Sequence, residues 1–257
     1  MAVDIRVRDR AVTLDERPLE RRVGLIILAT DHTTEPDFCR LVASARIGVY
    51  VARIAYANPV TPDNLRAMGP ALTAGAALLL PGETLDAICY SCTSASVVIG
   101  DEPVAAAIRA AKQGAAVVTP TLAACHGLTA LGARRISVLT PYTVATSRPM
   151  ADYFAGHGFD IASFTCLGLD DDREMARIAP DTLVEAARDA TAADAEALFI
   201  SCTALRAAPL AARIEQAIGR PVVTSNLATA WQCLRLCGDT AAGPELGALM
   251  ARPLVAG

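Results

Sequence analysis

The chain has 257 residues, of which 53% are apolar, and this excludes a disordered, collagen-like or small disulfide-stabilised protein. At about 100 to 200 residues per domain, the length predicts one large domain or two similar halves. The net charge of −4 and the pI of about 5.4 predict that neither nucleic acid nor an anionic membrane surface is a partner.

Short apolar runs alternate with amphipathic stretches along the whole chain, as is typical of an α/β protein with a largely parallel sheet. Helix signals separate the runs: Asp101-Glu102-Pro103 opens one helix and Pro180-Asp181 opens another. The runs predict strands near residues 23–28, 48–54, 86–91, 116–119, 135–140, 159–166, 196–201 and 221–224.

The predicted strands form two similar sets, which indicates an internal duplication. Ser-Cys-Thr follows an apolar run twice, with Cys92 and Cys202 separated by 110 residues, and VVT recurs at a spacing of 105. We therefore expect two pseudo-symmetric halves, each a four-stranded parallel sheet flanked by helices. The expected divisions are an N-terminal arm at 1–22, a first half at 23–121, a second half at 122–238 and a C-terminal tail at 239–257.

The duplication singles out two of the eight cysteines. Cys92 and Cys202 each follow a predicted strand, and ligands of parallel sheets bind beyond the carboxyl ends of strands. Each cysteine is expected to precede a helix, whose dipole would lower the thiol pKa from about 8.5. The backbone amides of Thr93, Ser94 and Thr203 would then hold a carboxylate or an enolate oxygen.

Two opposed thiols suit reactions in which one group removes a proton and another delivers one on the opposite face. Racemisation and cis–trans isomerisation both need such a pair. A single cysteine at the end of a strand is more often a small packed side chain. A matched pair in a duplicated motif favours function, with Cys92 as the nucleophile or base and Cys202 as the opposing acid.

Five motifs carry a resemblance to a known family: VGLIILATDHTTE, YSCTSASVVIGDE, LTPYTV, CLGLDDDREMARIAP and LFISCTALR. They resemble the maleate isomerase and arylmalonate decarboxylase branch of the aspartate/glutamate racemase superfamily. Within it, they are most similar to racemase-like proteins of ectoine utilisation. The resemblance spans roughly residues 20 to 237. It implies two flavodoxin-like halves, no cofactor, a site between the halves, Cys92 and Cys202 as catalytic residues, and substrate contact by Tyr142.

Two positions depart from the family pattern and bear on the substrate. Maleate isomerases have Asn in the loops where this chain has Asp31 and Asp172. An aspartate offers only acceptors and repels a second carboxylate, so we expect a small carboxylate whose other end is cationic or donates hydrogen bonds. Ectoine or a diaminobutyrate derivative fits this description, which predicts a role in ectoine or hydroxyectoine catabolism. Asp172 could instead cap the helix that begins near Arg173.

The same resemblance leaves three other functions open. The chain could isomerise maleate through covalent addition of Cys92 to the alkene, or decarboxylate a malonate, although decarboxylases of this family have Gly in place of the first cysteine. It could also be a non-catalytic binding protein that keeps the cleft. His32 follows Asp31 in the same loop and is a further candidate for substrate contact.

The remaining cysteines and the single lysine predict little chemistry. Cys39, Cys125 and Cys166 are expected to pack in the core, and a zinc site of Cys89, Cys92, Cys233 and Cys237 is disfavoured because Cys89 lies inside an apolar run.

All 23 basic residues except Lys112 are arginines, and Lys112 stands at an apparently exposed helix end, which argues against a pyridoxal lysine. The absence of a signal-peptide pattern or an apolar run long enough to span a membrane predicts a cytoplasmic protein. No metal is expected, because nothing near Asp31, His32 and Glu35 completes a set of ligands. A homo-oligomer is also expected.

Overall fold

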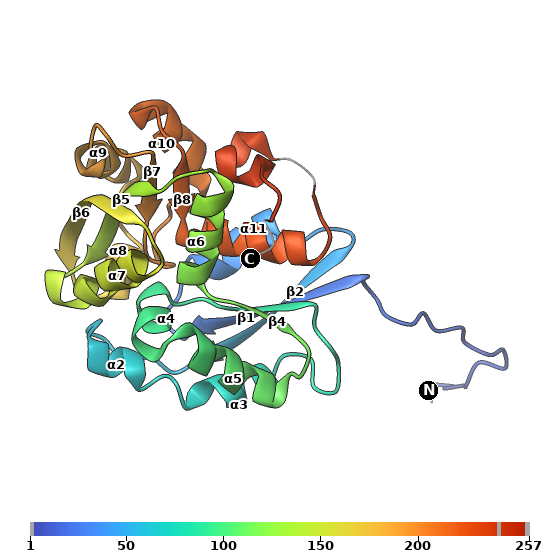
Figure 1. Ribbon diagram of the computed structural model, residues 1–257. Helices are drawn as coiled ribbons and strands as arrows, with labels where there is room; N and C mark the ends of the chain where they lie inside the picture. Colours follow the sequence, from blue (N-terminus) through green and yellow to red (C-terminus); the bar gives the residue numbers. More distant parts are fainter. Residues whose placement is uncertain (1–2, 241–242, 255–257) are drawn as a thin grey trace.

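The predicted strands all form, and they build two parallel sheets of the same order. The computed structural model describes residues 3–240 and 243–254. The first sheet has the order β2-β1-β3-β4 and the second has the order β6-β5-β7-β8 (Figure 1). The bounds are β1 (Arg21–Leu28), β2 (Ile47–Ile54), β3 (Ala87–Tyr90), β4 (Ala116–Val118), β5 (Arg135–Tyr142), β6 (Asp160–Leu169), β7 (Ala197–Ile200) and β8 (Val222–Thr224). The α/β fold with two four-stranded parallel sheets is thereby confirmed.

The central strands are buried on both faces, which explains their continuous apolar sequences. All residues of β3 and β7 are buried, and in β1 only Arg21 is exposed. β3 and β7 lie at equivalent places in the two sheets, and Cys92 and Cys202 each stand two residues beyond them. The repeat therefore brings the two Ser-Cys-Thr triplets to the carboxyl edges of two matching sheets.

Helices cover both sheets. Those in or after the first sheet are α1 (Thr34–Leu41), α2 (Pro62–Arg66), α3 (Ala71–Ala77), α4 (Thr93–Ile99), α5 (Asp101–Ala111) and α6 (Pro120–Ala130). The second set is α7 (Val144–Gly156), α8 (Asp172–Met175), α9 (Pro180–Ala190), α10 (Ala211–Ile218) and α11 (Ser225–Leu236), with 3₁₀ helices η1 (Ala208–Leu210), η2 (Pro244–Leu246) and η3 (Ala248–Ala251). Of the helices described, none is long and apolar enough to cross a membrane.

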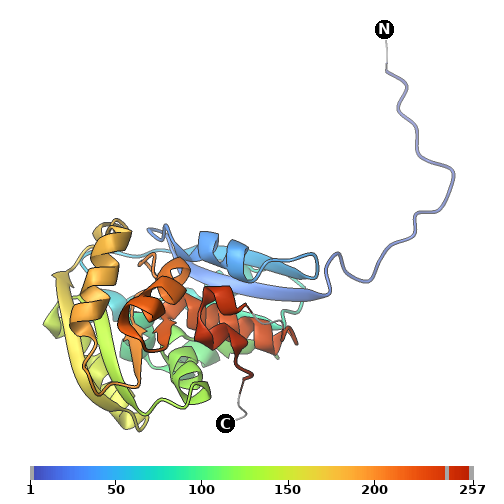
Figure 2. The ribbon, with the colours of Figure 1, turned by 90° about the horizontal axis from the view of Figure 1, so that it is seen from above.

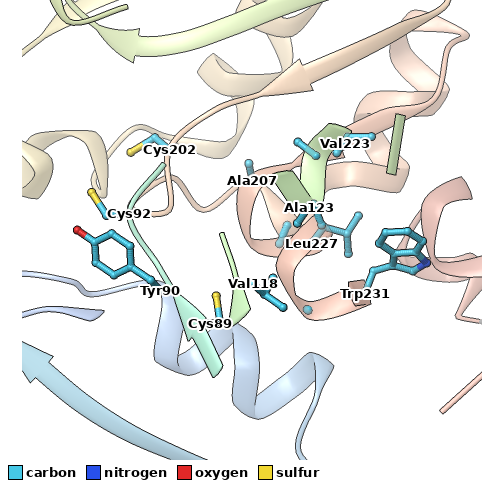
Figure 3. Close-up of a cluster of buried hydrophobic side chains, with 14 of the residues drawn as sticks. Cys89, Tyr90, Cys92, Val118, Ala123, Cys202, Ala207, Val223, Leu227 and Trp231 are labelled. Atoms are coloured by element: carbon cyan, nitrogen blue, oxygen red, sulfur yellow. The ribbon is translucent and has the colours of Figure 1, made fainter. Parts of the chain in front are cut away.

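Two helices cross between the halves. α6 leaves the first sheet and packs against β8, whereas α11 leaves the second sheet and packs against β3 and β4 (Figures 1 and 2). α11 is buried over residues 225–234, with Trp231 fully covered. Leu227 and Trp231 share one apolar cluster with Val118 of the first sheet and Val223 of the second (Figure 3). The division at residues 121 and 122 stays a prediction, and this exchange shows that the two sheets share one core.

The two ends of the chain behave differently. The arm leads away from the body of the molecule (Figure 2), and its side chains Val3, Ile5 and Val7 are 84%, 90% and 92% exposed. Residues 243–254 of the tail pack on the same chain instead, with Leu249 fully buried and the Trp231 indole donating to the carbonyl of Arg252 at 2.8 Å. Residues 1–2 of the arm and 241–242 and 255–257 of the tail lie outside the described residues.

Two sequence expectations outside the site were wrong. Lys112 is buried rather than exposed, because its ammonium donates to the carbonyls of Leu80 and Glu83 at 2.7 and 3.0 Å and closes the loop beneath the first sheet. Cys39 is exposed on α1 rather than packed in the core, since the adjacent Phe38 takes the inward position. Cys125 is buried as expected, and Cys166 is half-buried.

Candidate active site

A small cavity of about 20 Å³ lies between the two halves, beyond the carboxyl ends of their strands. Both paired cysteines line it, together with most of the polar residues expected from the sequence. Its walls are Leu28, Asp31, Tyr56, Val60, Leu65, Cys92, Ser94, Tyr142, Asp172, Met175, Cys202, Thr203 and Ala204. A cavity of this size leaves no room for a dinucleotide.

Cys92 is placed by the first half. It has extended backbone angles, φ −150° and ψ 106°, and is the N-cap residue of α4. Its sulfur faces the amide of Ala95 and lies 4.0 Å from the hydroxyl oxygen of Ser94. Figure 3 shows Cys92 next to Cys202, with the Tyr90 hydroxyl directed at Cys92. The predicted position of Cys92 at a helix N-terminus is therefore found.

Cys202 is placed by the second half in a strained conformation. Its φ is +94°, in the left-handed region that favours glycine, which costs a residue with a side chain about 1–3 kcal/mol. The sulfur faces the Tyr142 hydroxyl and the amides of Ala204 and Leu205, and lies 3.9 Å from the sulfur of Met175. The expected helix directly after Cys202 was wrong: a turn follows, and regular helix begins only with η1 and α10.

The expected lowering of the thiol pKa values was also wrong. Burial raises the pKa of Cys92 to about 12 and that of Cys202 to about 11, because the enclosed cavity removes water from a thiolate. Hydrogen bonds from backbone amides oppose this effect at both sulfurs without cancelling it. Charge on Cys202 further raises the pKa of Cys92, so the two sulfurs resist being ionised together.

Asp31 lies in the cavity wall but is already hydrogen-bonded within its own loop. One carboxylate oxygen accepts from the amides of Thr33 and Thr34 at 2.8 Å each, and the other accepts from the Thr34 hydroxyl at 2.6 Å. Burial is the main cause that raises the pKa of Asp31. This carboxylate shapes the start of α1 and still presents an acceptor edge to the cavity.

Asp172 is a buried acceptor held by donors from the first half. It accepts from the Asn58 side chain at 2.8 Å and from the Thr30 hydroxyl. The suggested role of Asp172 as a helix cap was wrong, because Asp171 caps α8 and accepts from the Arg173 amide at 2.9 Å. Asp172 instead lines the cavity, as expected from its position where maleate isomerases have Asn.

Two other expected residues lie away from the cavity. His32 is exposed and lines a separate surface depression with Asp171, Arg173 and Arg177. The Thr93 hydroxyl donates to Ser225 of α11 at 2.8 Å, and Thr93 is not among the cavity-lining residues. Ser94 and Thr203 do line the cavity, so the structure brings together seven of the nine expected site residues.

The other residues that line the cavity, Tyr56 among them, were not predicted from the sequence. The Tyr56 ring lines the cavity, and its buried hydroxyl has no hydrogen-bond partner within the described part of the chain. The internal repeat offered a partial signal, because Tyr56 lies two residues after β2 and Asp172 lies three residues after the matching strand β6. Leu28, Val60, Leu65 and Met175 gave no signal in the sequence beyond their apolar character.

A hydrogen-bond network ties the loops of the two halves around the cavity. The Thr33 hydroxyl donates to the carbonyl of Ala204 at 2.8 Å, and the Thr203 hydroxyl donates to the carbonyl of Ser91 at 3.2 Å. The Asn226 side chain reaches the carbonyl of Thr203 at 3.0 Å. The first two bonds join the halves, and the third holds the loop after Cys202 to α11.

No metal cluster accompanies these side chains in the part of the chain described: no three or more His, Cys, Asp or Glu residues are grouped as ligands. The polar groups of the cavity are hydroxyls, thiols, carboxylates and backbone amides, and among residues 3–240 and 243–254 no Lys, Arg or His lines it.

The sequence profile of the family described as arylmalonate decarboxylase matches residues 70–250. This chain belongs to the arylmalonate decarboxylase family. The branch inferred from the motifs, which joins arylmalonate decarboxylases with maleate isomerases, is thereby confirmed.

Curated relatives of this family member include both enzymes. It is 27% identical over 241 residues to a maleate isomerase of Nocardia farcinica, covering 90% of this chain and 95% of the relative. It is also 32% identical over 139 residues to the arylmalonate decarboxylase of Bordetella bronchiseptica, covering 53% and 58%.

Solved structures agree with this assignment. A cysteine-to-serine mutant of the Nocardia farcinica maleate cis–trans isomerase with a covalently bound succinylcysteine intermediate is 25% identical, with a TM-score of 0.81, covering 90% of this chain and 98% of that one. A glycine-to-cysteine mutant of arylmalonate decarboxylase with bound sulfate ion is 27% identical, with a TM-score of 0.75 over 89% and 99%. These relatives support an isomerase that works through a cysteine intermediate.

Proposed function

We propose that the protein is a cofactor-independent isomerase of the racemase or epimerase type, which uses Cys92 and Cys202 on a small carboxylate substrate. The observation that carries this proposal is that the two thiols follow matching strands of the two halves and line one cavity. An acid and a base on different walls can act on opposite faces of one carbon atom.

The electrostatic coupling between the two sulfurs fits this use. Because charge on one sulfur opposes charge on the other, the pair is expected to hold one thiolate and one thiol during turnover rather than two thiolates. The thiolate removes the proton from the carbon next to the substrate carboxylate, and the C–H electrons pass into an enolate. The opposite thiol then donates its proton to the other face, which leaves the charge on the second sulfur.

The substrate carboxylate is assigned to the donors around the cysteines. Ser94 and Tyr142 offer hydroxyl groups, and the turn after Cys202 offers the amides of Ala204 and Leu205. The enolate oxygen that develops during proton transfer would accept hydrogen bonds from the same donors. Because these bonds strengthen as charge develops on the oxygen, they lower the barrier more than they stabilise the bound substrate.

The opposite end of the substrate is assigned to Asp31 and Asp172. With two buried carboxylates and no basic residue among the cavity walls, a second carboxylate would be poorly accommodated, whereas a cation or a hydrogen-bond donor would be favoured. Ectoine and diaminobutyrate derivatives have this character. The setting in ectoine or hydroxyectoine catabolism rests on this argument and on the sequence motifs alone.

A second candidate is maleate cis–trans isomerisation, which the maleate isomerase relatives favour. Here the Cys92 thiolate would form a C–S bond with one alkene carbon, and the other carbon would take a proton from Cys202. Rotation about the resulting single bond, return of that proton and cleavage of the C–S bond would give fumarate. Malonate decarboxylation is less favoured because it makes no use of the second thiol.

The deciding experiment is incubation in D₂O with ectoine, hydroxyectoine, aspartate and maleate, followed by NMR of the products. The wild type is compared with Cys92→Ser and Cys202→Ser, and Cys125→Ser serves as a control because this buried thiol lies outside the cavity. We expect deuterium incorporation to fall by at least about a hundredfold in both site variants and to persist in the control.

Each outcome of that experiment separates the candidates. A succinyl adduct on Cys92 in the Cys202→Ser variant would support maleate isomerisation. Exchange and turnover that are undiminished in both site variants would contradict the two-thiol mechanism. A protein that binds a compound tightly but exchanges nothing would be a non-catalytic binding protein.

We also propose that the protein works in the cytoplasm as a homo-oligomer. This extends the expectations drawn from net charge and from cysteine use. Light scattering of the purified protein measures the oligomeric state directly.

A further inference from the structure

The Tyr56 hydroxyl is a polar group of the cavity that has no role in the proposed proton transfer. It is buried and lacks a hydrogen-bond partner in the described part of the chain, although Asp31, Ser94 and Asp172 line the same cavity. An unpaired buried hydroxyl is destabilising, and native proteins retain few of them. A ligand that enters the cavity would supply the missing partner.

Neither carboxylate that lines the cavity accepts a hydrogen bond from Tyr56, although each of the two accepts from other donors. Asp172 accepts from Asn58 and Thr30, and Asp31 accepts from Thr33 and Thr34. Burial, followed by the negative charges of Cys92, Asp172 and Cys202, raises the pKa of Tyr56. The phenol therefore stays protonated at neutral pH and keeps a hydrogen to donate.

The loop that carries Tyr56 is fixed to the second half. The amide of Val60 donates to the carbonyl of Asp170 at 2.7 Å, and the Thr146 hydroxyl donates to the carbonyl of Val60 at 2.8 Å. Asn58 lies between Tyr56 and Val60 in the same loop, and its side-chain amide donates to both Asp171 and Asp172. Tyr56 is thus held at the cavity beside the same segment that carries Asp172.

We propose that Tyr56 and Asp172 together recognise one polar group of the substrate, with Tyr56 donating a hydrogen bond to it and Asp172 accepting one from it. This inference rests on the proposed function and narrows its substrate class. A group that both accepts and donates is a hydroxyl or a carboxamide. The favoured substrate is therefore a small monocarboxylate that carries a hydroxyl or carboxamide at its far end, rather than a dicarboxylate.

The test measures binding, so it does not depend on turnover. The Cys202→Ser protein is titrated calorimetrically with butyrate, 4-hydroxybutyrate and succinamate, which share a four-carbon monocarboxylate frame. We expect 4-hydroxybutyrate or succinamate to bind about tenfold more tightly than butyrate. Adding Tyr56→Phe should remove that preference and leave butyrate binding unchanged.

Tyr50→Phe is the matched control, because it removes a phenol from β2 of the same half that does not line the cavity. Its preference among the three acids should equal that of the Cys202→Ser parent. A preference that survives Tyr56→Phe would overturn the proposal, and so would a failure of all three acids to bind.

A thermal melt of the ligand-free variants gives a second readout. Because Tyr56→Phe removes an unpaired hydroxyl, the Tm should stay equal or rise, whereas a fall in Tm would show that the hydroxyl has a structural partner and would contradict the proposal. Selective binding without deuterium exchange would uphold the role of Tyr56 while rejecting the isomerase, and exchange without selectivity would do the reverse.

Discussion

At the residue scale, Cys202 combines chemistry with backbone strain. Its φ of +94° is one that glycine adopts at little cost. Strain of this kind persists where the surroundings hold a side chain in a required direction, and here the Tyr142 hydroxyl and two amides surround the sulfur.

Two variants that both lack the thiol separate the strain from the chemistry. We expect Cys202→Gly to be more stable than Cys202→Ala by about 1 kcal/mol, because glycine relieves the strained φ but gains freedom in the unfolded chain. Urea unfolding of both proteins measures the difference, and both should be inactive. An alanine variant as stable as the glycine variant would show that the conformation carries no strain.

The ionisation of Cys92 gives a prediction for its reactivity. Since burial raises its pKa to about 12, its thiolate fraction should grow about tenfold per pH unit between pH 7 and 10. Alkylation by iodoacetamide, followed by peptide mass spectrometry, should show this slope without a plateau. Exposed Cys39 serves as the reference for reagent access. A plateau at Cys92 below pH 9 would mean that the site stabilises the thiolate in the free protein.

At the element scale, α11 supports the loop that carries Cys202. The Asn226 side chain donates to the buried carboxylate of Asp37 at 2.9 Å and to the carbonyl of Thr203 at 3.0 Å. Burial raises the pKa of Asp37, and the hydrogen bond from Asn226 lowers it. One amide therefore joins α1 of the first half to the loop of the second cysteine.

Asn226→Ala should cost about 2 kcal/mol of unfolding free energy, because it leaves a buried carboxylate oxygen unpaired. The loss should be larger at pH 7.5 than at pH 4.5. Without Asn226 the folded-state pKa of Asp37 rises further above its unfolded value, and a group of this kind contributes stability that is lost as the pH rises. Denaturant unfolding at both pH values tests this, with Gln232→Ala, on the same helix beside His126, as control. An equal loss at both pH values would contradict it.

The strands were predictable from the sequence because parallel strands buried on both faces read as continuous apolar runs, as in Ala197–Ile200. The paired cysteines were predictable because the duplication repeats their motif. The packing of α11 on the opposite sheet was not predictable, since a helix buried all round shows no polar face to orient it. Tyr56 and the raised thiol pKa values depend on an enclosure that only the folded chain creates.

At the scale of the whole molecule, the arm contributes little to the fold. All residues from 3 to 16 are exposed, including Val12 and Leu14 at 67% and 83%. Deleting residues 2–16 should change the unfolding free energy by less than about 0.5 kcal/mol and leave the deuterium exchange rate unchanged. Denaturant unfolding of the truncated protein measures the first effect, and a larger loss would show that the arm packs on the body or on a second subunit.

The exchange of α6 and α11 limits what either half can do alone. A polypeptide ending at Thr119 would carry β3 and β4 without α11, the helix that covers them in the full chain. Such a fragment could bury this surface only by taking a helix from another molecule. Joining both halves in one chain makes the swap intramolecular, so assembly of the cavity no longer depends on protein concentration. Two cysteines that would otherwise be symmetry copies can then diverge, one toward the role of base and the other toward that of acid.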